Sequence, residues 1–314
     1  MKAGLLCVGL TTLDVAAWPI EAIPREETTT LIEGLACSPA GTAAGAAFVA
    51  ARLGMGVRLA SAVGDDATGR FVRFLLEEEG VDTGLLETIP GRTTSATLLA
   101  IDSAGRRPNF HAPGAGMLAR PSEAVVAAGE RARFLHYAGV GGRHLDGGPG
   151  AALVQAARAA GTIVTCDLIS PRATALEELK RLLPSVDYFM PSAAEALALT
   201  GVADLWAAAD LFISLGAGAC VIKNGRKGAL MALGGARTVL PAHAITPVDT
   251  TSCGDSFCAG FIAALDRGRE PQEAGRFATA TAALVAMGLG TLGKVESFEA
   301  TEAAMREMTL DEAA

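Results

Sequence analysis

The chain has 314 residues, of which half are hydrophobic and 19% are charged, and its formal net charge at pH 7 is -8. This much apolar material suffices for a large buried core and argues against a disordered chain. The acidic balance offers no basic surface to a polyanion, so nucleic acid is not an expected partner.

The six cysteines form no CxxC pair and no metal-ligand spacing, and most lie in apolar runs. Such cysteines behave as small hydrophobic residues and favour a reducing compartment over a disulfide scaffold. The N-terminal apolar run is short and soon meets Asp14, so it indicates a first β-strand rather than a signal peptide. No apolar stretch is long enough to cross a bilayer. We therefore expect a cytoplasmic protein with no membrane partner.

Short β-like runs alternate with helical runs along most of the chain. The expected strands are residues 5–15, 57–63, 134–138, 162–167, 188–190 and 220–223. The expected helices are residues 43–53, 69–79, 151–160, 173–183, 193–200 and 203–215. Several of these helices stop at a glycine, the residue that best tolerates a left-handed C-cap. This alternation predicts parallel βαβ units and an α/β fold whose sheet is covered on both faces.

Two segments depart from this alternation, at about residues 18–38 and 93–111, and both are richer in Thr and charge. The second indicates a β-hairpin with Gly105 in its turn. Antiparallel strands outside a parallel core predict a small β lid over one edge. We expect one domain over residues 1–314 that carries these two lid segments.

The stretch from Val248 to Asp255 carries the clearest chemical signal. Small residues at 252–254 precede an apolar helical run, and Asp255 falls in its first turn. The unpaired N–H groups of a helix start can bind an anion, and a carboxylate beside them can act as general base towards a hydroxyl. The alternative is a purely structural role, in which Asp255 only caps the helix and Gly254 only makes a tight turn.

This string resembles the C-terminal signature of the ribokinase-like (PfkB) carbohydrate kinases, Asp-Thr-x-Gly-Ala-Gly-Asp before a small-residue helix. The resemblance implies a three-layer α/β/α fold with a central, mostly parallel sheet and a small β lid. It also implies that Asp255 is the catalytic base and that Ser252, Cys253 and Gly254 supply the anion hole.

The resemblance extends over nearly the whole chain. Residues 40–47 and the following Ala-Arg-Leu-Gly at 51–54 are similar to the family's sugar-binding helix, and residues 61–83 to the segment after it. The implied substrate contacts are Asp14, Gly41, Thr42, Gly45 and Asp255. Arg107 joins them as a lid arginine, because in related enzymes such a residue can reach a charged substrate.

On the nucleotide side, Ser192-Ala-Ala-Glu195 resembles the family's Asn-x-x-Glu, which helps to place Mg²⁺ and phosphate. Residues 223–228 resemble a loop along the nucleotide, and residues 279–290 resemble the helix and turn beside the adenine. The implied ATP contacts are Ser192, Lys223, Asn224, Gly225, Gly228, Gly254 and Thr279. Glu195 would hold Mg²⁺ through water, and Asp249 and Thr251 could ligate a monovalent cation such as K⁺.

Four positions depart from the family pattern. Ser252 and Cys253 replace Gly and Ala in the anion hole, Gly45 replaces a substrate-binding Asn, and Ser192 replaces the Asn of Asn-x-x-Glu. A left-handed backbone at Ser252 would carry strain on the order of 1–3 kcal/mol. Cys253 at a helix N-terminus would favour its thiolate and react with thiol reagents.

Other polar residues give weaker signals. The four histidines show no metal-ligand spacing, so zinc is not expected. His111 in the lid-to-core return is either a solvated loop residue or a substrate contact. Asp167 at the end of a strand either lines the floor of the sugar pocket or caps the segment that follows.

The resemblance implies an enzyme that uses MgATP to phosphorylate a hydroxyl, through in-line transfer to the acceptor. The segments expected to form the pocket contain no Lys or Arg apart from the nearby Arg107, and little aromatic surface. We therefore expect a neutral or singly charged monosaccharide or sugar acid that reacts through a hydroxymethyl group. A nucleoside kinase of the same fold and a non-catalytic sugar sensor are the alternatives, and a homodimer through the lid is the expected assembly.

Overall fold

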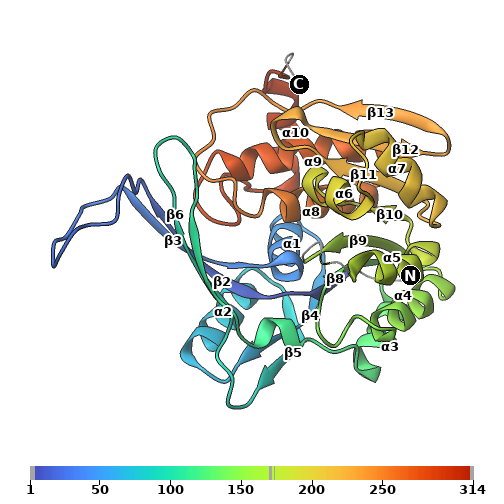
Figure 1. Ribbon diagram of the computed structural model, residues 1–314, viewed down its shortest axis with the longest axis horizontal. Coiled ribbons are helices and arrows are strands. Elements are labelled where there is room, and N and C mark those ends of the chain that lie inside the picture. The colour runs from blue at the N-terminus through green and yellow to red at the C-terminus, as the bar shows by residue number, and fades with distance from the viewer. Residues whose placement is uncertain (1–3, 170–171, 173, 312–314) are drawn as a thin grey trace.

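A computed structural model describes residues 4–169, 172 and 174–311. Within these residues the strands form one nine-stranded and one four-stranded sheet (Figure 1). In spatial order the large sheet consists of β13 (Ala236–Leu240), β12 (Ala229–Leu233), β11 (Ala219–Lys223), β10 (Tyr188–Phe189), β9 (Ile163–Leu168), β8 (Phe134–Val140), β1 (Leu5–Gly9), β4 (Val57–Gly64) and β5 (Asp82–Ile89).

The large sheet is parallel from β11 to β5, and β12 and β13 join it as antiparallel neighbours. Every residue of the central strands β1 and β8 is buried, as their largely apolar sequences require when both faces are covered. The expected central, mostly parallel sheet is confirmed.

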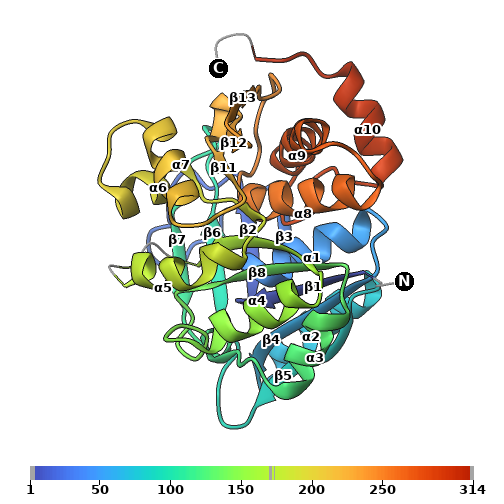
Figure 2. The same ribbon diagram turned by 90° about the vertical axis from the view of Figure 1, so that its right-hand side faces the viewer.

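Helices cover both faces of this sheet (Figure 2). The α-helices are α1 (Thr42–Arg52), α2 (Ala67–Glu78), α3 (Glu123–Arg131), α4 (Pro149–Ala159), α5 (Ala175–Leu182), α6 (Ala193–Thr200), α7 (Leu205–Ser214), α8 (Cys253–Asp266), α9 (Pro271–Ala286) and α10 (Phe298–Glu307). Short 3₁₀ turns lie at Ala115–Leu118, Leu183–Ser185 and Gly225–Lys227. One core cluster joins α1, α8 and α9 to the sheet, and a second joins α3, α4, α5 and α7 to it. The three-layer architecture is confirmed.

Local capping explains where several helices begin and end. The Asp66 side chain accepts a hydrogen bond from Gly69 N at 2.8 Å and starts α2. Gly201 ends α6 in the left-handed conformation, with φ 68°. The expected helix at residues 173–183 begins at Ala175, and Ala173 lies outside the described residues.

The expected first strand at residues 5–15 is wrong as a single element. The chain forms β1 at Leu5–Gly9 in the large sheet and then β2 (Thr12–Trp18) in the small one. The change of direction follows Gly9, whose φ of 154° suits glycine. A β-carbon on Gly9 would also lie 2.3 Å from Ala138 O. The apolar run is continuous in the sequence, but its two halves serve different sheets.

The small sheet forms the lid and has the order β3 (Gly34–Ala40), β2, β6 (Ala96–Ala100) and β7 (Asn109–Ala112). It stands out from the three layers at the left of Figure 1. The expected hairpin is confirmed, since β6 and β7 pair antiparallel and Gly105 adopts φ 76° between them. The other lid strands lie at residues 12–18 and 34–40, so they extend beyond the expected segment 18–38 on both sides.

In the described part of the chain, no helix has by itself the length and apolar character to cross a bilayer. The pair α6 and α7, which meet at a 67° bend, passes that test only when the two are taken together.

Candidate active site

The turn before α8 is held by one buried carboxylate. Asp249, which is 1% exposed, accepts hydrogen bonds from Thr251 N at 2.8 Å and from Gly290 N at 3.1 Å. Ser252 then adopts φ 56° and ψ 7°, which is the left-handed backbone that carries strain at a serine. The helix starts at Cys253, and the first N–H groups of a helix lack carbonyl partners within it. The turn therefore presents donors suited to an anion.

Asp255 lies in the first turn of α8, which packs against α1 and α9 (Figure 1). Its side chain keeps some contact with solvent, yet the surrounding protein raises its pKa to about 7. Burial is the main cause, the carboxylates of Asp167, Asp14 and Glu195 add to it, and Lys223 opposes it. A carboxylate with a pKa near neutrality can accept a proton from a hydroxyl.

Beneath this turn lies an ion pair that the sequence did not predict. Lys223 Nζ lies 2.5 Å from Asp167 Oδ2, and the two side chains are 12% and 4% exposed. Cys258 Sγ lies 3.4 Å from the same carboxylate oxygen. Asp167 is therefore paired with Lys223, and its other carboxylate oxygen accepts from Leu168 N at 2.8 Å. The pairing joins the carboxyl ends of β9 and β11, which are distant in sequence and share no motif.

The lid contributes Asp14 from β2. Asp14 is 7% exposed, and burial raises its pKa to about 6, while a hydrogen bond with the Thr97 side chain opposes that rise. Among the described residues, its Oδ1 atom has no hydrogen-bond partner. A buried acceptor without a partner is costly, so a ligand hydroxyl that donated to Oδ1 would be bound favourably.

Arg107 reaches from the lid hairpin to the turn before α8. Its Nη1 donates to Thr251 Oγ1 at 3.3 Å, and its charge also acts on Asp14 and Cys253. The structure thus brings Arg107 to the same site as Asp14 and the start of α8. His111, in contrast, lies on exposed β7, where its Nδ1 is 3.1 Å from Thr97 Oγ1.

The start of α1 completes the substrate side of the site. Gly41 has φ 89°, and a β-carbon there would lie 2.8 Å from Leu10 O, so the position requires glycine. Thr42, an expected substrate contact, donates its hydroxyl to Ala138 O at 2.6 Å and so holds the end of β8. Gly45 lies next to Asp255, and a β-carbon on it would be 3.1 Å from Asp255 Oδ2.

On the nucleotide side, Ser192 and Glu195 pair with each other as a capping box of α6. Ser192 N and Oγ donate to Glu195 Oε2 at 2.7 and 2.6 Å, and Ser192 Oγ accepts from Glu195 N at 3.3 Å. An isolated β-bridge between Ser192 and Lys223 brings this cap next to the end of β11. The Glu195 carboxylate is also close enough to Asp255 to raise the pKa of that residue.

The remaining residues expected at the nucleotide follow β11 or lie on α9. Asn224 and Gly225 form the loop after Lys223, and Gly228 adopts φ 76° where a β-carbon would lie 1.9 Å from Leu240 O. Thr279 on α9 is 7% exposed and donates to Arg276 O at 2.8 Å. Its hydroxyl is thus bound within its own helix.

The surroundings of Cys253 argue against the reactive thiol expected there. Burial raises the pKa of Cys253 to about 12, and Arg107 opposes this rise only in part. Its Sγ lies 3.5 Å from Ala282 O on α9, so the thiol packs into the protein rather than facing the anion hole. Desolvation of a thiolate outweighs the helix dipole here.

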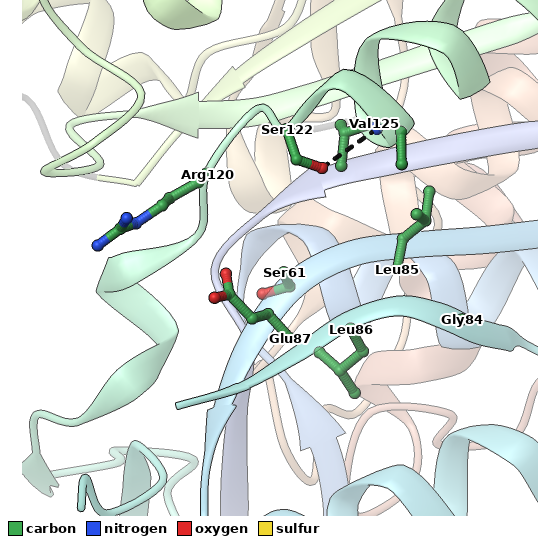
Figure 3. Close-up of a pocket in the computed structure, with 9 residues that line it drawn as sticks. Ser61, Gly84, Leu85, Leu86, Glu87, Arg120, Ser122 and Val125 are labelled. Atoms are coloured by element: carbon green, nitrogen blue, oxygen red, sulfur yellow. Dashed lines mark hydrogen bonds between the residues drawn. The ribbon is translucent and has the colours of Figure 1, made fainter. Parts of the chain in front are cut away.

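A separate cavity of about 370 Å³ lies between β4, β5 and the start of α3 (Figure 3). It is lined by Ser61, Gly84, Leu85, Leu86, Glu87, Arg120, Ser122, Ala124 and Val125. The Ser61 hydroxyl already donates to Gly9 O, and the Ser122 hydroxyl accepts from Val125 N. None of the expected site residues lines this cavity, so it is not the candidate active site.

Comparison with known proteins identifies one family. The model described as pfkB family carbohydrate kinase matches residues 2–297. The chain is 30% identical to a ribokinase of Haemophilus influenzae over 254 residues, which cover 78% of this chain and 79% of the relative. It is 28% identical to a nucleoside kinase of Methanothermobacter thermautotrophicus, over 91% of this chain and 90% of the relative. A fructokinase of Klebsiella pneumoniae is 30% identical, over 72% of this chain and 76% of the relative.

Solved structures share the fold. A ribokinase of Arabidopsis thaliana complexed with ribose and ATP superposes with a TM-score of 0.79 at 24% identity, over 98% of this chain and 99% of that one. A candidate ribokinase II of E. coli in complex with ATP and Mg²⁺ gives a TM-score of 0.83 at 20% identity, over 97% and 99% of the two chains.

Proposed function

The chain belongs to the pfkB family of carbohydrate kinases, and from that premise we propose that it transfers the γ-phosphoryl group of MgATP to a hydroxymethyl group of a monosaccharide or sugar acid. Enzymes of this family are phosphotransferases with an alcohol group as acceptor. The proposal includes a cytoplasmic location, because the reaction consumes MgATP.

One observation carries the proposal: Asp255 stands in the first turn of α8, beside the donors of residues 252–254, with a pKa raised to about 7. At neutral pH such a carboxylate is partly ionised and basic enough to take the proton of a hydroxyl. The neighbouring N–H groups stabilise the charge of the transferred phosphoryl group. Base and anion hole thus act on the two ends of the same forming bond.

The residues around this turn fit a triphosphate and Mg²⁺. Lys223 Nζ would lie 3.5 Å from a β-carbon on Gly254, so a buried ammonium reinforces the anion-binding end of α8. Glu195 supplies a carboxylate of the kind that Mg²⁺ binds directly or through water. When bound, the metal neutralises charge on the phosphates. Asn224, Gly225, Gly228 and Thr279 are the proposed neighbours of the nucleotide, with Ser192 acting through its contact with Glu195.

The acceptor side supports a sugar hydroxyl. The unpartnered Oδ1 of Asp14 is suited to accept a hydrogen bond from one, and Gly41 and Gly45 leave room beside the base. Arg107 is the one basic residue among the expected acceptor contacts, which suits a neutral or singly charged acceptor better than a sugar phosphate. The nucleoside kinase among the relatives keeps a nucleoside as the second candidate substrate.

The test of substrate class is kcat/KM with MgATP across fructose, ribose, a 2-keto-3-deoxy sugar acid, fructose 6-phosphate and adenosine. We expect one of the first three to be preferred. A clear preference for fructose 6-phosphate or adenosine would contradict the proposed acceptor. Binding of a sugar without ADP release under any condition would favour the non-catalytic sensor instead.

We also propose that a second copy of the chain covers the outer lid face, formed by Val15, Leu35, Cys37, Leu98 and Phe110. The strand register places these residues on the side opposite Asp14 and Thr97. Leu35, Leu98 and Phe110 are 63%, 48% and 59% exposed. The strand residues of this face carry no charge, so two copies can meet without like-charge repulsion.

Sedimentation analysis tests this assembly. Leu98→Glu together with Phe110→Glu should yield monomers where the unmodified protein is a dimer. Leu310→Glu changes an equally exposed leucine away from the lid and should leave the dimer intact. A dimer that survives the lid substitutions would contradict the proposed interface.

A further inference from the structure

Two charged side chains meet beneath the start of α8 from strands that are not adjacent. Asp167 ends β9, Lys223 ends β11, and β10 lies between them in the sheet. Lys223 Nζ lies 2.5 Å from Asp167 Oδ2, while Asp167 Oδ1 accepts from Leu168 N at 2.8 Å. Both oxygens of the carboxylate are therefore engaged, and its orientation is fixed.

The ammonium of Lys223 occupies an unfavourable place for a free cation. It lies against the first turn of α8, 3.5 Å from the position of a β-carbon on Gly254. A helix N-terminus carries partial positive charge, which repels a cation unless an anion balances it. Asp167 supplies that balance. Without it, the ammonium would pair with another carboxylate of this region.

Asp255 is the carboxylate within the same turn of α8. The charged groups that act on it are Asp14 from β2, Asp167 from β9, Glu195 from α6 and Lys223 from β11. Gly45, which packs against it from α1, brings no charge. Lys223 is thus the one cation in this set, and its position decides how strongly Asp255 holds a proton.

We propose that Asp167 is a positioning residue of the kinase reaction: it holds the Lys223 ammonium beneath the anion hole and keeps that ammonium from pairing with Asp255. This inference rests on the proposed role of Asp255 as base. The Lys223 charge then stabilises the transferred phosphoryl group, while Asp255 keeps its affinity for a proton. An ion pair between Lys223 and Asp255 would weaken the base and occupy the cation.

The electrostatics of the site agree with this arrangement. Burial and the Asp167 charge raise the pKa of Asp255, and Lys223 lowers it. For Lys223, burial lowers the pKa, but the neighbouring Asp167 carboxylate raises it above its ordinary value and keeps the side chain charged. Loss of the Asp167 charge would leave the Lys223 charge unopposed at Asp255.

The test compares Asp167→Asn, Lys223→Met and the double variant by the pH dependence of kcat/KM. In Asp167→Asn we expect the acid limb to move to lower pH by about one unit and kcat at pH 8 to fall about tenfold, because the base is weakened. In the double variant, which adds Lys223→Met, the acid limb of the pH profile should move back towards its position in the unmodified enzyme. A merely structural role for Asp167 would not be reversed in this way. An unmoved limb in Asp167→Asn, or no return in the double variant, would overturn the proposal.

A second measurement does not depend on turnover. The carboxyl ¹³C signal of Asp255, assigned by its loss in Asp255→Asn, can be titrated in each variant, and the same shift and return are expected. If Asp167→Asn does not fold, Lys223→Met still tests the proposal. With the one cation gone and the Asp167 charge unopposed, the Asp255 signal should titrate at higher pH than in the unmodified protein, and the absence of this upward shift would overturn the proposal. Absence of kinase activity in the unmodified protein would instead contradict the proposed function.

Discussion

Gly45 on α1 and Asp255 on α8 lie in direct apposition, so that a β-carbon on residue 45 would be 3.1 Å from Asp255 Oδ2 and 3.4 Å from its β-carbon. The first turn of α8 approaches α1 this closely because residue 45 has no side chain. The departure from the family's Asn at this position is thus matched to the observed orientation of the proposed base.

Gly45→Ala should lower kcat about tenfold or more with little change in the KM for ATP. The added methyl group would push the carboxylate out of line with the acceptor hydroxyl, and small displacements of a reacting group are costly. Steady-state kinetics measure this effect. Gly56→Ala is the matched control, because a β-carbon at Gly56 would meet nothing within 4 Å. Equal kinetics in both variants would contradict the described packing.

Stability should depend on pH through Asp255. Its pKa rises from 3.8 to about 7 on folding, so the stabilisation is fully present below pH 4 and is lost as the pH rises through 7. Asp255→Asn removes the buried charge and should raise the free energy of unfolding at pH 8 by an amount on the order of 1–4 kcal/mol, with little gain at pH 4. Denaturant unfolding at the two pH values measures it, with the exposed Glu130→Gln as control. A gain of the same size at both pH values would argue against a charge effect.

Ser252→Gly should stabilise the protein by about 1 kcal/mol, since glycine adopts the left-handed backbone at this position without strain. Ser252→Ala keeps the β-carbon and should give no such gain. Thermal unfolding of the two variants gives the comparison. If Ser252→Gly destabilises instead, the 3.5 Å contact between Ser252 Oγ and Thr291 Oγ1 contributes more than the strain costs.

In the monomeric variant with Leu98→Glu and Phe110→Glu, thiol reagents at pH 8 should label Cys37 and leave Cys253 unmodified. Cys37 is exposed on the lid, whereas burial raises the pKa of Cys253 to about 12, and the thiolate is the reactive form. Mass spectrometry of the labelled protein locates the modification, and Cys37→Ala should abolish rapid labelling. Rapid modification of Cys253 that MgATP prevents would restore the reactive thiol expected from sequence.

The sequence predicted the α/β fold and the start of α8 well, because both depend on local patterns. Glycine stops and apolar runs marked most helices and strands, and Val248–Asp255 placed small residues and a carboxylate at a helix start. The break between β1 and β2 was missed, since the apolar run continues through Gly9 and only tertiary contacts divide it.

The parts of the site that depend on pairing were harder to predict. Asp167 and Lys223 are 56 residues apart in the sequence, and only the order of β9, β10 and β11 brings them together. The Ser192–Glu195 cap, by comparison, had a visible signal, because Ser-x-x-Glu before an apolar run is the pattern of a capping box. The same four residues also resemble the family's Asn-x-x-Glu motif, so the sequence alone did not separate the capping role from the ligand role.

The most direct test of the central claim is the turnover of Asp255→Asn measured beside its affinity for ATP. As the proposed base, Asp255 should account for a factor of roughly 10²–10⁴ in kcat, whereas the affinity for ATP should stay within about threefold of the unmodified enzyme. Circular dichroism would show that the fold is retained. A variant that keeps more than about a tenth of the original kcat would contradict the assignment of Asp255 as the base.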